Sequence, residues 1–398
     1  MTLVDIISNG GLLCDGDWIE TKDQDVRGKV RLIQLADIGD GEFKDKSSKY
    51  ITLETAERLH CTFLEKGDIL IARLPEPLGR ACIFPLEGAY ITAVDIAILR
   101  IKDISINPQY IMYLINSSTF RSQIKQYESG TTRKRISRKN LEKIEFSLPN
   151  LEIQNRIVAR IEELFSKLDK AVDTLKTTKE QLAVYRQAVL KDAFSDFEKK
   201  DSIRNLTTVV TSGSRGWAKY YSNSGALFVR IGNLTHSGID IDFSDIQHIT
   251  PPDNAEGIRT RLQPNDVLVS ITADLGSIGF VSKKGEEAYI NQHIALVRFQ
   301  NSAQGRFMAW YLRSEYGQKD LLKNKRGGGK LGLGLDDIRD TPVPIVDDVT
   351  AKETVDKIEE QLSVCNSIEK TVDTALAQTD AMRQSILKQA FEGKKDVY

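Results

Sequence analysis

Two long stretches of the chain carry apolar residues at the spacing of a helix that packs along its length. Apolar side chains recur every three or four positions in residues 150–195 and again in residues 348–391, and neither range contains proline or glycine. This pattern predicts two unbroken helices, each with a coiled-coil seam. The first seam consists of Ile157, Ile161, Leu164, Leu168, Ala171, Leu175, Thr178, Leu182, Tyr185 and Val189. The second seam consists of Ile358, Leu362, Cys365, Ile368, Val372, Ala375, Thr379, Met382 and Ile386.

Neither seam is expected to remain in contact with water. Both are buried most simply if the two helices pack on each other within one chain, in antiparallel orientation, with one globular domain at each end of the pair. The alternative is that the seams serve only to join two copies of the chain.

The rest of the chain alternates short apolar runs with polar turns, which predicts mixed α and β structure. The runs expected to form strands are residues 30–35, 69–72, 96–101, 227–231, 267–271 and 294–299. A helix should start after Asn107, with Asn107 as its cap and Pro108 in its first turn. The predicted fold class is α+β, with two similar domains separated by two long antiparallel helices. The predicted boundaries are 1–148 and 199–343 for the domains and 149–198 and 344–398 for the helical segments.

An internal repeat supports this division. Residues 186–194 (RQAVLKDAF) return as residues 383–391 (RQSILKQAF), about half the chain length later. The globular segments repeat more weakly, pairing residues 35–38 with 231–234, 67–71 with 265–269, 97–100 with 295–298, and 110–113 with 307–310. Because these echoes occur in the same order at nearly one offset, they predict a duplicated unit rather than chance similarity.

Composition and charge narrow the class of protein. The 398 residues include 40% hydrophobic and 28% charged residues, which is an ordinary globular balance, and the net charge is −1. Any binding of nucleic acid must therefore depend on local basic clusters rather than on bulk charge. The four cysteines and four histidines have no disulfide or metal-ligand spacing, which argues against a zinc site. No secretion signal or membrane-length apolar run is visible, so we expect a cytoplasmic protein.

Basic loops occupy matching places near the end of each globular segment. The candidate DNA contacts of the first loop are Arg133, Lys134, Arg135 and Arg138. Those of the second loop are Lys325, Arg326 and Lys330, beside a run of three glycines. Cations neutralise phosphate charge, and glycine lets the backbone approach a groove wall closely. The alternative is that each loop is simply a solvated, charged surface.

A second candidate surface combines aromatic, hydroxyl and cationic groups in loops. Its residues are Trp18 and Lys22 in the first half and Ser214, Arg215, Trp217 and Lys219 in the second. Such groups can reach base edges and phosphates together. The two tryptophans could equally be half-buried anchors of their loops. A third loop, with Arg73 and Arg80, has residues 270–274 as its counterpart, and both could line a groove or form tight turns.

The chain resembles the specificity subunit of Type I restriction-modification systems over nearly its entire length. The first half resembles a target recognition domain through GDWIE, RLIQLADIGDG, GDILIARLPEPLGRACI and GTTRKRISRKNLEKI. The second resembles another such domain through TSGSRGW, FVRIGNL, INQHIALVRF and GLGLDDIRDTPVP. LPNLEIQNRIVARIEEL and RQAVLKDAF resemble the conserved helical regions of that family.

The resemblance implies a fold, a function and a set of partners. Each domain would recognise one half of a bipartite, asymmetric site in double-stranded DNA, and the helices would fix the gap between the halves. The helices would also dock two modification subunits, which bring S-adenosylmethionine and methylate adenine, and restriction subunits would join. This chain would bind no cofactor itself. Val158 and Phe165 are candidate outward positions for docking, although both could instead widen the seam.

Two other classes of function compete with this interpretation. A stand-alone adenine methyltransferase is suggested by Asn107-Pro108-Gln109-Tyr110, which is close to the Asn-Pro-Pro-Tyr motif of amino methyltransferases. It lacks the second proline, however, and no glycine-rich cofactor loop follows a strand. A coiled-coil scaffold with two protein-binding modules would make the basic loops incidental. We therefore expect a non-catalytic DNA-recognition subunit.

Overall fold

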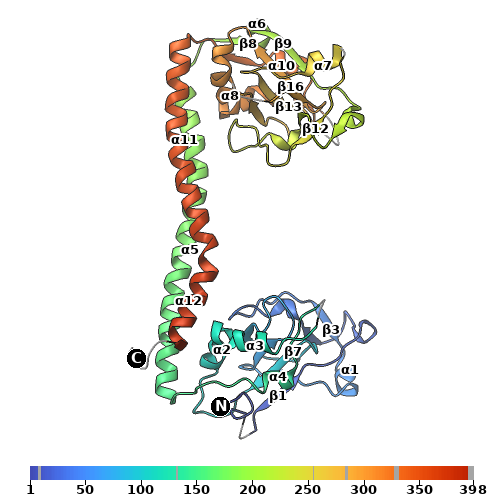
Figure 1. Cartoon of the computed structure of the whole chain (residues 1–398), viewed down its shortest axis with the longest axis vertical. Helices are drawn as coiled ribbons and strands as arrows, with labels where there is room; N and C mark the ends of the chain where they lie inside the picture. Colours follow the sequence, from blue (N-terminus) through green and yellow to red (C-terminus); the bar gives the residue numbers. More distant parts are fainter. Residues whose placement is uncertain (8–9, 131–132, 254, 283–285, 327–330, 393–398) are drawn as a thin grey trace. The chain divides into compact units, whose positions relative to one another are not determined.

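The computed structural model describes residues 1–398 except 8–9, 131–132, 254, 283–285, 327–330 and 393–398. The chain divides into two compact units. Unit 1 comprises Met1–Leu175 and Thr374–Tyr398, and unit 2 comprises Lys176–Asp373. Each unit therefore contains one globular lobe and parts of both long helical segments (Figure 1).

Two small sheets form the lobe of unit 1. The first is antiparallel and has the order β1 (Leu12–Asp15), β7 (Ile96–Arg100), β4 (Ile69–Ala72), β5 (Ala81–Ile83). The second has the order β3 (Lys49–Ile51), β2 (Val30–Ile33), β6 (Tyr90–Thr92), with β2 and β6 parallel. The central strands β4 and β7 are almost entirely buried, as their continuous apolar runs indicate.

The helices of the unit 1 lobe are short. They are α1 (Leu53–Arg58), α2 (Pro108–Asn116), α3 (Ser118–Gln126) and α4 (Arg138–Leu141), with 3-10 turns η1 (Thr21–Asp23) and η2 (Leu35–Asp37). The predicted start of α2 is confirmed, because the Asn107 side chain accepts hydrogen bonds from the backbone N–H groups of Gln109 and Tyr110. Helix α2 then buries Tyr110 and Ile111 in the main apolar core of this unit.

Unit 2 repeats both sheets. Its antiparallel sheet has the order β14 (Ile278–Phe280), β13 (Val267–Ser270), β16 (Ile294–Phe299), β9 (Thr207–Ser212), which is the strand order of unit 1 written in reverse. The other sheet has the order β10 (Tyr221–Ser222), β12 (Gln247–Ile249), β11 (Ala226–Val229), β15 (Ala288–Ile290), again with one parallel pair. Unit 2 has further strands compared with unit 1. They are β10 in this sheet and the separate pair β17 (Pro342–Pro344) and β8 (Lys200–Ser202).

The helices of unit 2 also correspond to those of unit 1. They are α6 (Ile203–Leu206), α7 (Ala255–Thr260), α8 (Gly305–Arg313), α9 (Glu315–Leu321) and α10 (Leu335–Arg339), with 3-10 turns η3 (Trp217–Tyr220), η4 (Ile231–Asn233) and η5 (Ser302–Gln304). The predicted match of residues 35–38 with 231–234 falls on η2 and η4. The match of residues 110–113 with 307–310 falls on α2 and α8.

Matching side chains occupy matching places in the two units. Asp68 is buried and ion-paired with Arg100 at 2.8 Å, and Asp266 is buried and ion-paired with Arg298 at 2.7 Å. The residue before each aspartate has a positive φ, 97° at Gly67 and 73° at Asn265. Asparagine and glycine tolerate this conformation best. The internal repeat predicted from sequence is therefore a repeat of the fold.

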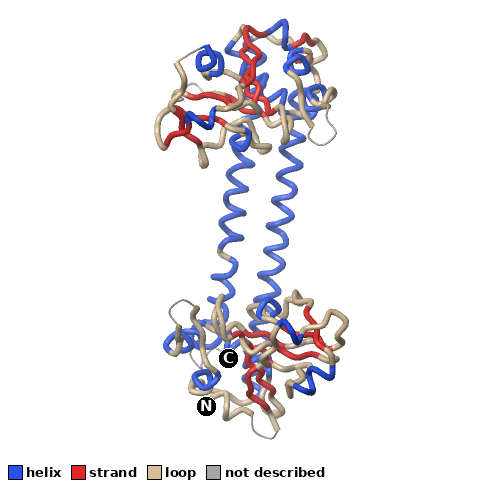
Figure 2. Tube along the Cα trace, turned by 90° about the vertical axis from the view of Figure 1, so that its right-hand side faces the viewer, coloured by secondary structure: helices blue, strands red, loops and turns tan. Residues whose placement is uncertain are grey.

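The long helices pack in antiparallel orientation within each unit. Helix α5 (Leu151–Phe194) contributes to both units, and α11 (Asp348–Ala377) and α12 (Thr379–Glu392) form the second long helical segment, which follows the lobe of unit 2 in the sequence (Figure 2). In unit 1, Ile161 and Leu387 share one apolar core, and Arg383 lies 4.9 Å from the ring centre of Phe165.

In unit 2, ion pairs join α5 to α11. Lys179 pairs with Asp373 at 2.7 Å and Arg186 with Glu369 at 2.6 Å. Because the residue numbers rise on α5 while they fall on α11, the predicted antiparallel direction is confirmed.

Three features of the helices differ from the sequence prediction. The second segment is divided at Gln378, whose N–H is shared between the carbonyl oxygens of Thr374 and Ala375. Several predicted seam residues are exposed, namely Ala171, Tyr185, Ile368 and Met382. Conversely, Val158 is buried and Phe165 is half-buried, both against the apolar core of unit 1. The helix packs on the lobe as well as on its neighbour, so its apolar stripe is wider and differently centred than a coiled-coil seam.

Candidate nucleic-acid interface

A groove of about 560 Å³ on unit 1 brings together loops that lie far apart in the sequence. Its lining includes Trp18, Leu74, Asp95, Arg133 and Arg135. Two of the candidate surfaces predicted from sequence, the tryptophan loop and the first basic loop, therefore meet at one place. The third candidate loop joins them through Leu74.

Backbone hydrogen bonds fix the loops around this groove. The N–H of Arg73 donates to the carbonyl of Asp95 at 2.9 Å, and the N–H of Ile136 donates to the carbonyl of Arg73 at 3.1 Å. Ser129 and Arg135 exchange two backbone hydrogen bonds at 2.8 and 2.9 Å, which join the two ends of the basic loop. These contacts hold the groove on a rigid frame.

Gly16 brings the tryptophan loop against the frame. A Cβ atom at Gly16 would lie 2.3 Å from the carbonyl oxygen of Ala93, so no larger residue fits there without a backbone shift. This contact places Trp18 at the edge of the groove with 70% of its surface exposed. An exposed indole on a fixed loop is suited to contact a nucleic acid.

The first basic loop supplies charge to the groove. Arg133 and Arg135 are exposed, and within the described part of the chain their guanidinium groups take part in no ion pair. Lys134 pairs with Glu128 at 2.6 Å, and Arg138 with Asp15 at 3.6 Å. Lys22 lies outside the groove lining and pairs with Glu20 at 2.6 Å. The two unpaired arginines are therefore candidate phosphate contacts on this unit.

The side chains of Arg80 and Arg73 make their contacts within the protein. Arg80 is 8% exposed, and its guanidinium donates to four carbonyl oxygens, which include those of Ile38 at 2.7 Å and Leu35 at 2.9 Å. A buried guanidinium whose donors are already used has no surface to offer DNA, so Arg80 is corrected to a loop-positioning residue. Arg73 is mostly buried, pairs with Asp15 at 3.3 Å and donates to the carbonyl of Val94.

Asp17 lies beside Trp18 and is partly buried. Burial raises its pKa from the ordinary value to about 6, although the backbone N–H of Thr62 donates to its carboxylate at 3.1 Å and favours the ionised form. The tryptophan loop is therefore held by a carboxyl group that changes its charge near pH 6.

Unit 2 carries the same backbone frame. The N–H of Ile271 donates to the carbonyl of His293 and the N–H of Leu333 donates to that of Ile271, both at 2.9 Å. Arg326 and Gly332 exchange two hydrogen bonds, as Ser129 and Arg135 do in unit 1. By this pattern His293 is the counterpart of Asp95.

Side chains on the unit 2 frame differ from those of unit 1. Ser214 is half-buried and accepts a hydrogen bond from Arg259 at 2.6 Å, whereas Arg215 is exposed. His293 is hydrogen-bonded to Thr272 through one ring nitrogen and to Gln292 through the other. The frame is common, but the chemical groups that it presents are not.

Trp217 is corrected from a candidate DNA contact to an anchor of its loop. It is only 2% exposed, stacks on Phe228 at 5.3 Å between ring centres and donates its indole N–H to Glu256. Trp217 therefore fits the alternative that a tryptophan anchors its loop. Trp18 does not, because it is exposed. Lys219 is exposed and lies 4.8 Å from the ring centre of Tyr220.

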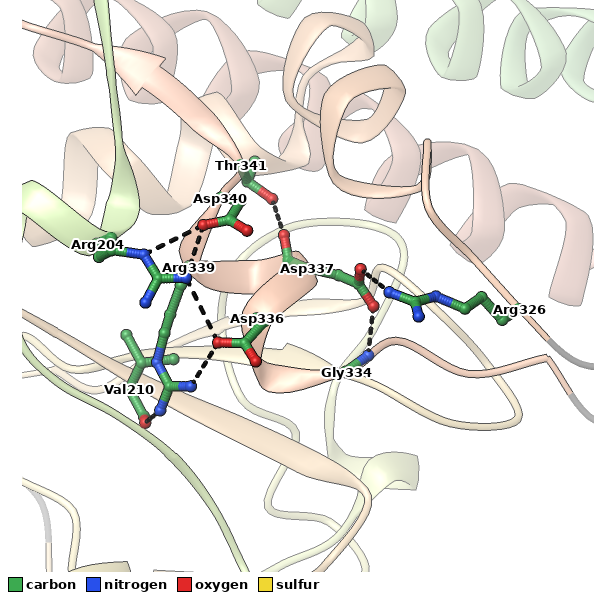
Figure 3. A network of polar contacts seen from close by, with 9 residues as sticks. All are labelled: Arg204, Val210, Arg326, Gly334, Asp336, Asp337, Arg339, Asp340 and Thr341. Atoms are coloured by element: carbon green, nitrogen blue, oxygen red, sulfur yellow. Dashed lines mark hydrogen bonds and ion pairs between the residues drawn. The ribbon is translucent and has the colours of Figure 1, made fainter.

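The second basic loop is attached to α10 by Arg326. Figure 3 shows its guanidinium on Asp337, at 2.6 Å, while the other oxygen of that carboxylate accepts the N–H of Gly334 at 2.7 Å. Arg326 is therefore both exposed and tied to a buried carboxylate. Lys325 is exposed, and Lys330 lies outside the described residues.

Sequence reasoning missed several residues of the two interfaces. Asp95, Arg259, Gln292 and His293 do not belong to a basic or aromatic cluster in the sequence. The only signal that could have found Asp95 and His293 is their position directly before the strands β7 and β16, which the repeat pairs with each other.

Among the described residues, no group of three or more His, Cys, Asp or Glu side chains is placed to hold a metal ion. No described helix is long and apolar enough to cross a membrane.

The chain belongs to the family of the Type I restriction modification DNA specificity domain. The family model matches residues 13–183 and 228–378, that is, most of both lobes and much of both helical segments. The resemblance inferred from sequence motifs is thereby confirmed.

Individual relatives agree with this family. The chain is 26% identical over 313 residues to the specificity subunit of the Type I restriction enzyme StySPI of Salmonella potsdam, a match that covers 73% of this chain and 66% of the relative. The match thus spans slightly less than two thirds of that relative's length. Specificity subunits are DNA-recognition subunits and not catalytic, so the family supports the non-enzymatic interpretation.

Solved structures share the fold. A chain from a study of complex assembly and conformational transition of the type I R-M system has a TM-score of 0.69 at 16% identity, covering 97% of this chain and 99% of that chain. The HsdS subunit from Thermoanaerobacter tengcongensis has a TM-score of 0.60 at 16% identity, covering 97% of this chain and 98% of that chain. The predicted fold class, two mixed α/β domains with long helices, is confirmed.

Proposed function

We propose that each unit of this specificity subunit recognises one half of a bipartite, asymmetric site in double-stranded DNA. The observation that carries the proposal is the unit 1 groove, where exposed Trp18 and the unpaired arginines Arg133 and Arg135 meet on a fixed backbone frame. Arginines neutralise phosphates and an exposed aromatic group can contact bases. Unit 2 has the same frame with different side chains, which suits recognition of an unlike half-site.

In this proposal the chain works with protein partners. Two modification subunits dock on the helices, carry S-adenosylmethionine and methylate adenine, and restriction subunits join them. The helical segments would set the gap between the two half-sites, since a stiff helix fixes spacing better than a flexible linker. Family membership and the antiparallel helix packing within each unit support this assignment.

Removal of the two unpaired arginine charges tests the proposal. The double variant Arg133→Gln and Arg135→Gln, in complex with the modification subunits, should bind DNA more weakly. The slope of log affinity against log salt should fall by about two, since each lost phosphate contact accounts for about 0.9. Affinity is measured by fluorescence anisotropy between about 50 and 200 mM salt.

A matched charge change serves as the control. The double variant Lys49→Gln and Lys125→Gln removes two exposed lysines outside the groove lining and should leave affinity and slope nearly unchanged. Equal affinity of the arginine variant and the wild type at moderate salt would instead favour a protein-binding scaffold.

A further inference from the structure

Asp95 is an acidic residue on the wall of a groove that otherwise offers cations. It follows β6 and directly precedes β7, and its carbonyl oxygen accepts the N–H of Arg73 at 2.9 Å, so its backbone is fixed. Within the described part of the chain, its carboxylate takes part in no hydrogen bond or ion pair, although Arg133 and Arg135 line the same groove. The carboxylate therefore remains available to a ligand.

The chemistry of a carboxylate restricts what it can meet on DNA. An ionised carboxylate only accepts hydrogen bonds, and phosphate oxygens are acceptors of the same charge. Asp95 therefore weakens contact with the DNA backbone unless a donor of the ligand faces it. The base-edge donors of duplex DNA are the amino groups of cytosine and adenine in the major groove and that of guanine in the minor groove, and the wider major groove admits a protein loop more readily.

Cytosine fits an isolated carboxylate better than adenine does. The amino group of adenine stands beside the acceptor N7, which suits the paired donor and acceptor of an asparagine or glutamine side chain. A carboxylate placed there would face the N7 lone pair. The cytosine amino group can be approached by a single acceptor, and aspartate accepts from it.

We propose that Asp95 is a specificity-determining residue of unit 1, which accepts a hydrogen bond from the amino group of one cytosine in its half-site. The inference rests on the proposed function and names one base contact within it. The counterpart on the unit 2 frame is His293, which is hydrogen-bonded to Gln292 and Thr272. At the same place in the fold, the two units thus present different chemical groups to DNA.

The test uses the chain in complex with its modification subunits. Methylated adenines are mapped genome-wide for the wild type, Asp95→Asn and Asp95→Ala, and binding is measured on duplexes in which each cytosine of the unit 1 half-site is changed singly to thymine. One such change should weaken wild-type binding about tenfold to a hundredfold. Asp95→Asn should accept thymine at that position, because its amide can donate to thymine O4. Asp95→Ala should lose the discrimination.

The control removes the same charge elsewhere in unit 1. Glu54→Gln, at an exposed position of α1, should leave the methylated sequence unchanged. Unaltered specificity in both Asp95 variants, a change in the other half-site, or wild-type binding that no single cytosine change weakens would each overturn the inference. The duplex measurements on the wild type can overturn the inference even if a variant fails to assemble, and the isosteric Asp95→Asn then carries the attribution to this residue. Failure of the wild-type complex to methylate any bipartite site would refute the proposed function instead.

Discussion

Arginine side chains in unit 1 fall into two groups according to what their guanidinium groups contact. Arg80 donates to carbonyl oxygens up to 45 positions away in the sequence, and Arg100 forms an ion pair with the buried Asp68. Arg133 and Arg135 line the groove. All four are equally basic in the sequence. Only the tertiary contacts separate the arginines that build the loops from those left free to bind phosphate.

Asp17 permits a pH prediction at the same scale. Its pKa of about 6 lies above the ordinary 3.8, so the folded chain holds more protons than the unfolded chain between about pH 4 and 6. Stability therefore falls as the pH rises through this window, and the penalty is constant above it. Asp17→Asn removes the penalty, so its free energy of unfolding relative to the wild type should increase from pH 4 to 7. Urea unfolding at several pH values measures this difference.

Glu54→Gln, which changes an exposed carboxylate in the same unit, is the control variant with which the pH dependence of Asp17→Asn is compared. A stability difference between Asp17→Asn and the wild type that does not vary with pH would contradict the assignment of a raised pKa.

Helix α5 shows how an element takes its role from what surrounds it. The apolar periodicity predicted a helix over residues 150–195, and the observed helix, Leu151–Phe194, is almost as long. The apolar periodicity did not predict which side chains are buried, because the helix contacts a neighbouring helix on one face and a lobe on another. Val158 therefore lies in the core of unit 1, whereas Tyr185 of the predicted seam is exposed.

A charge at Val158 should consequently unfold unit 1 rather than only block docking of a partner. Val158→Asp places an unpaired carboxylate in an apolar core, which costs about 3 kcal/mol or more of unfolding free energy. The neighbouring exposed change Ala159→Asp should cost about 1 kcal/mol or less, mainly through helix propensity. Urea unfolding followed by circular dichroism compares the two. Equal losses would mean that Val158 is not buried as described.

On the scale of the whole molecule, two units share one fold but not one surface. The strand orders agree, the ion pairs Asp68–Arg100 and Asp266–Arg298 agree, and the groove frames are closed by equivalent backbone hydrogen bonds. The side chains on those frames differ. A chain built in this way can present two distinct recognition surfaces from one architecture.

Exchange of one lobe tests this modular arrangement. Replacement of residues 199–343 by the corresponding segment of a relative with a different target should alter only one half of the methylated sequence. The other half should be retained, since unit 1 and its groove are untouched. Mapping of methylated adenines measures the outcome. A change in both halves would show that the units do not recognise DNA independently.

The sequence by itself determined the periodic elements and the repeat of this protein. Six apolar runs marked strands that the structure contains, and Asn107 and Pro108 marked the start of α2, because burial periodicity and helix capping are local properties. Other strands of two to four residues were missed, since they carry too little pattern, and the six-residue edge strand β9 was missed as well.

Only the tertiary structure decided which polar residues share a site. Trp18, Asp95 and Arg135 meet in one groove through hydrogen bonds between loops that are far apart in the chain, while Trp217 and Arg80 are withdrawn into the interior. Charge and aromaticity can be seen in a sequence. Exposure and convergence depend on long-range contacts, which no local pattern records.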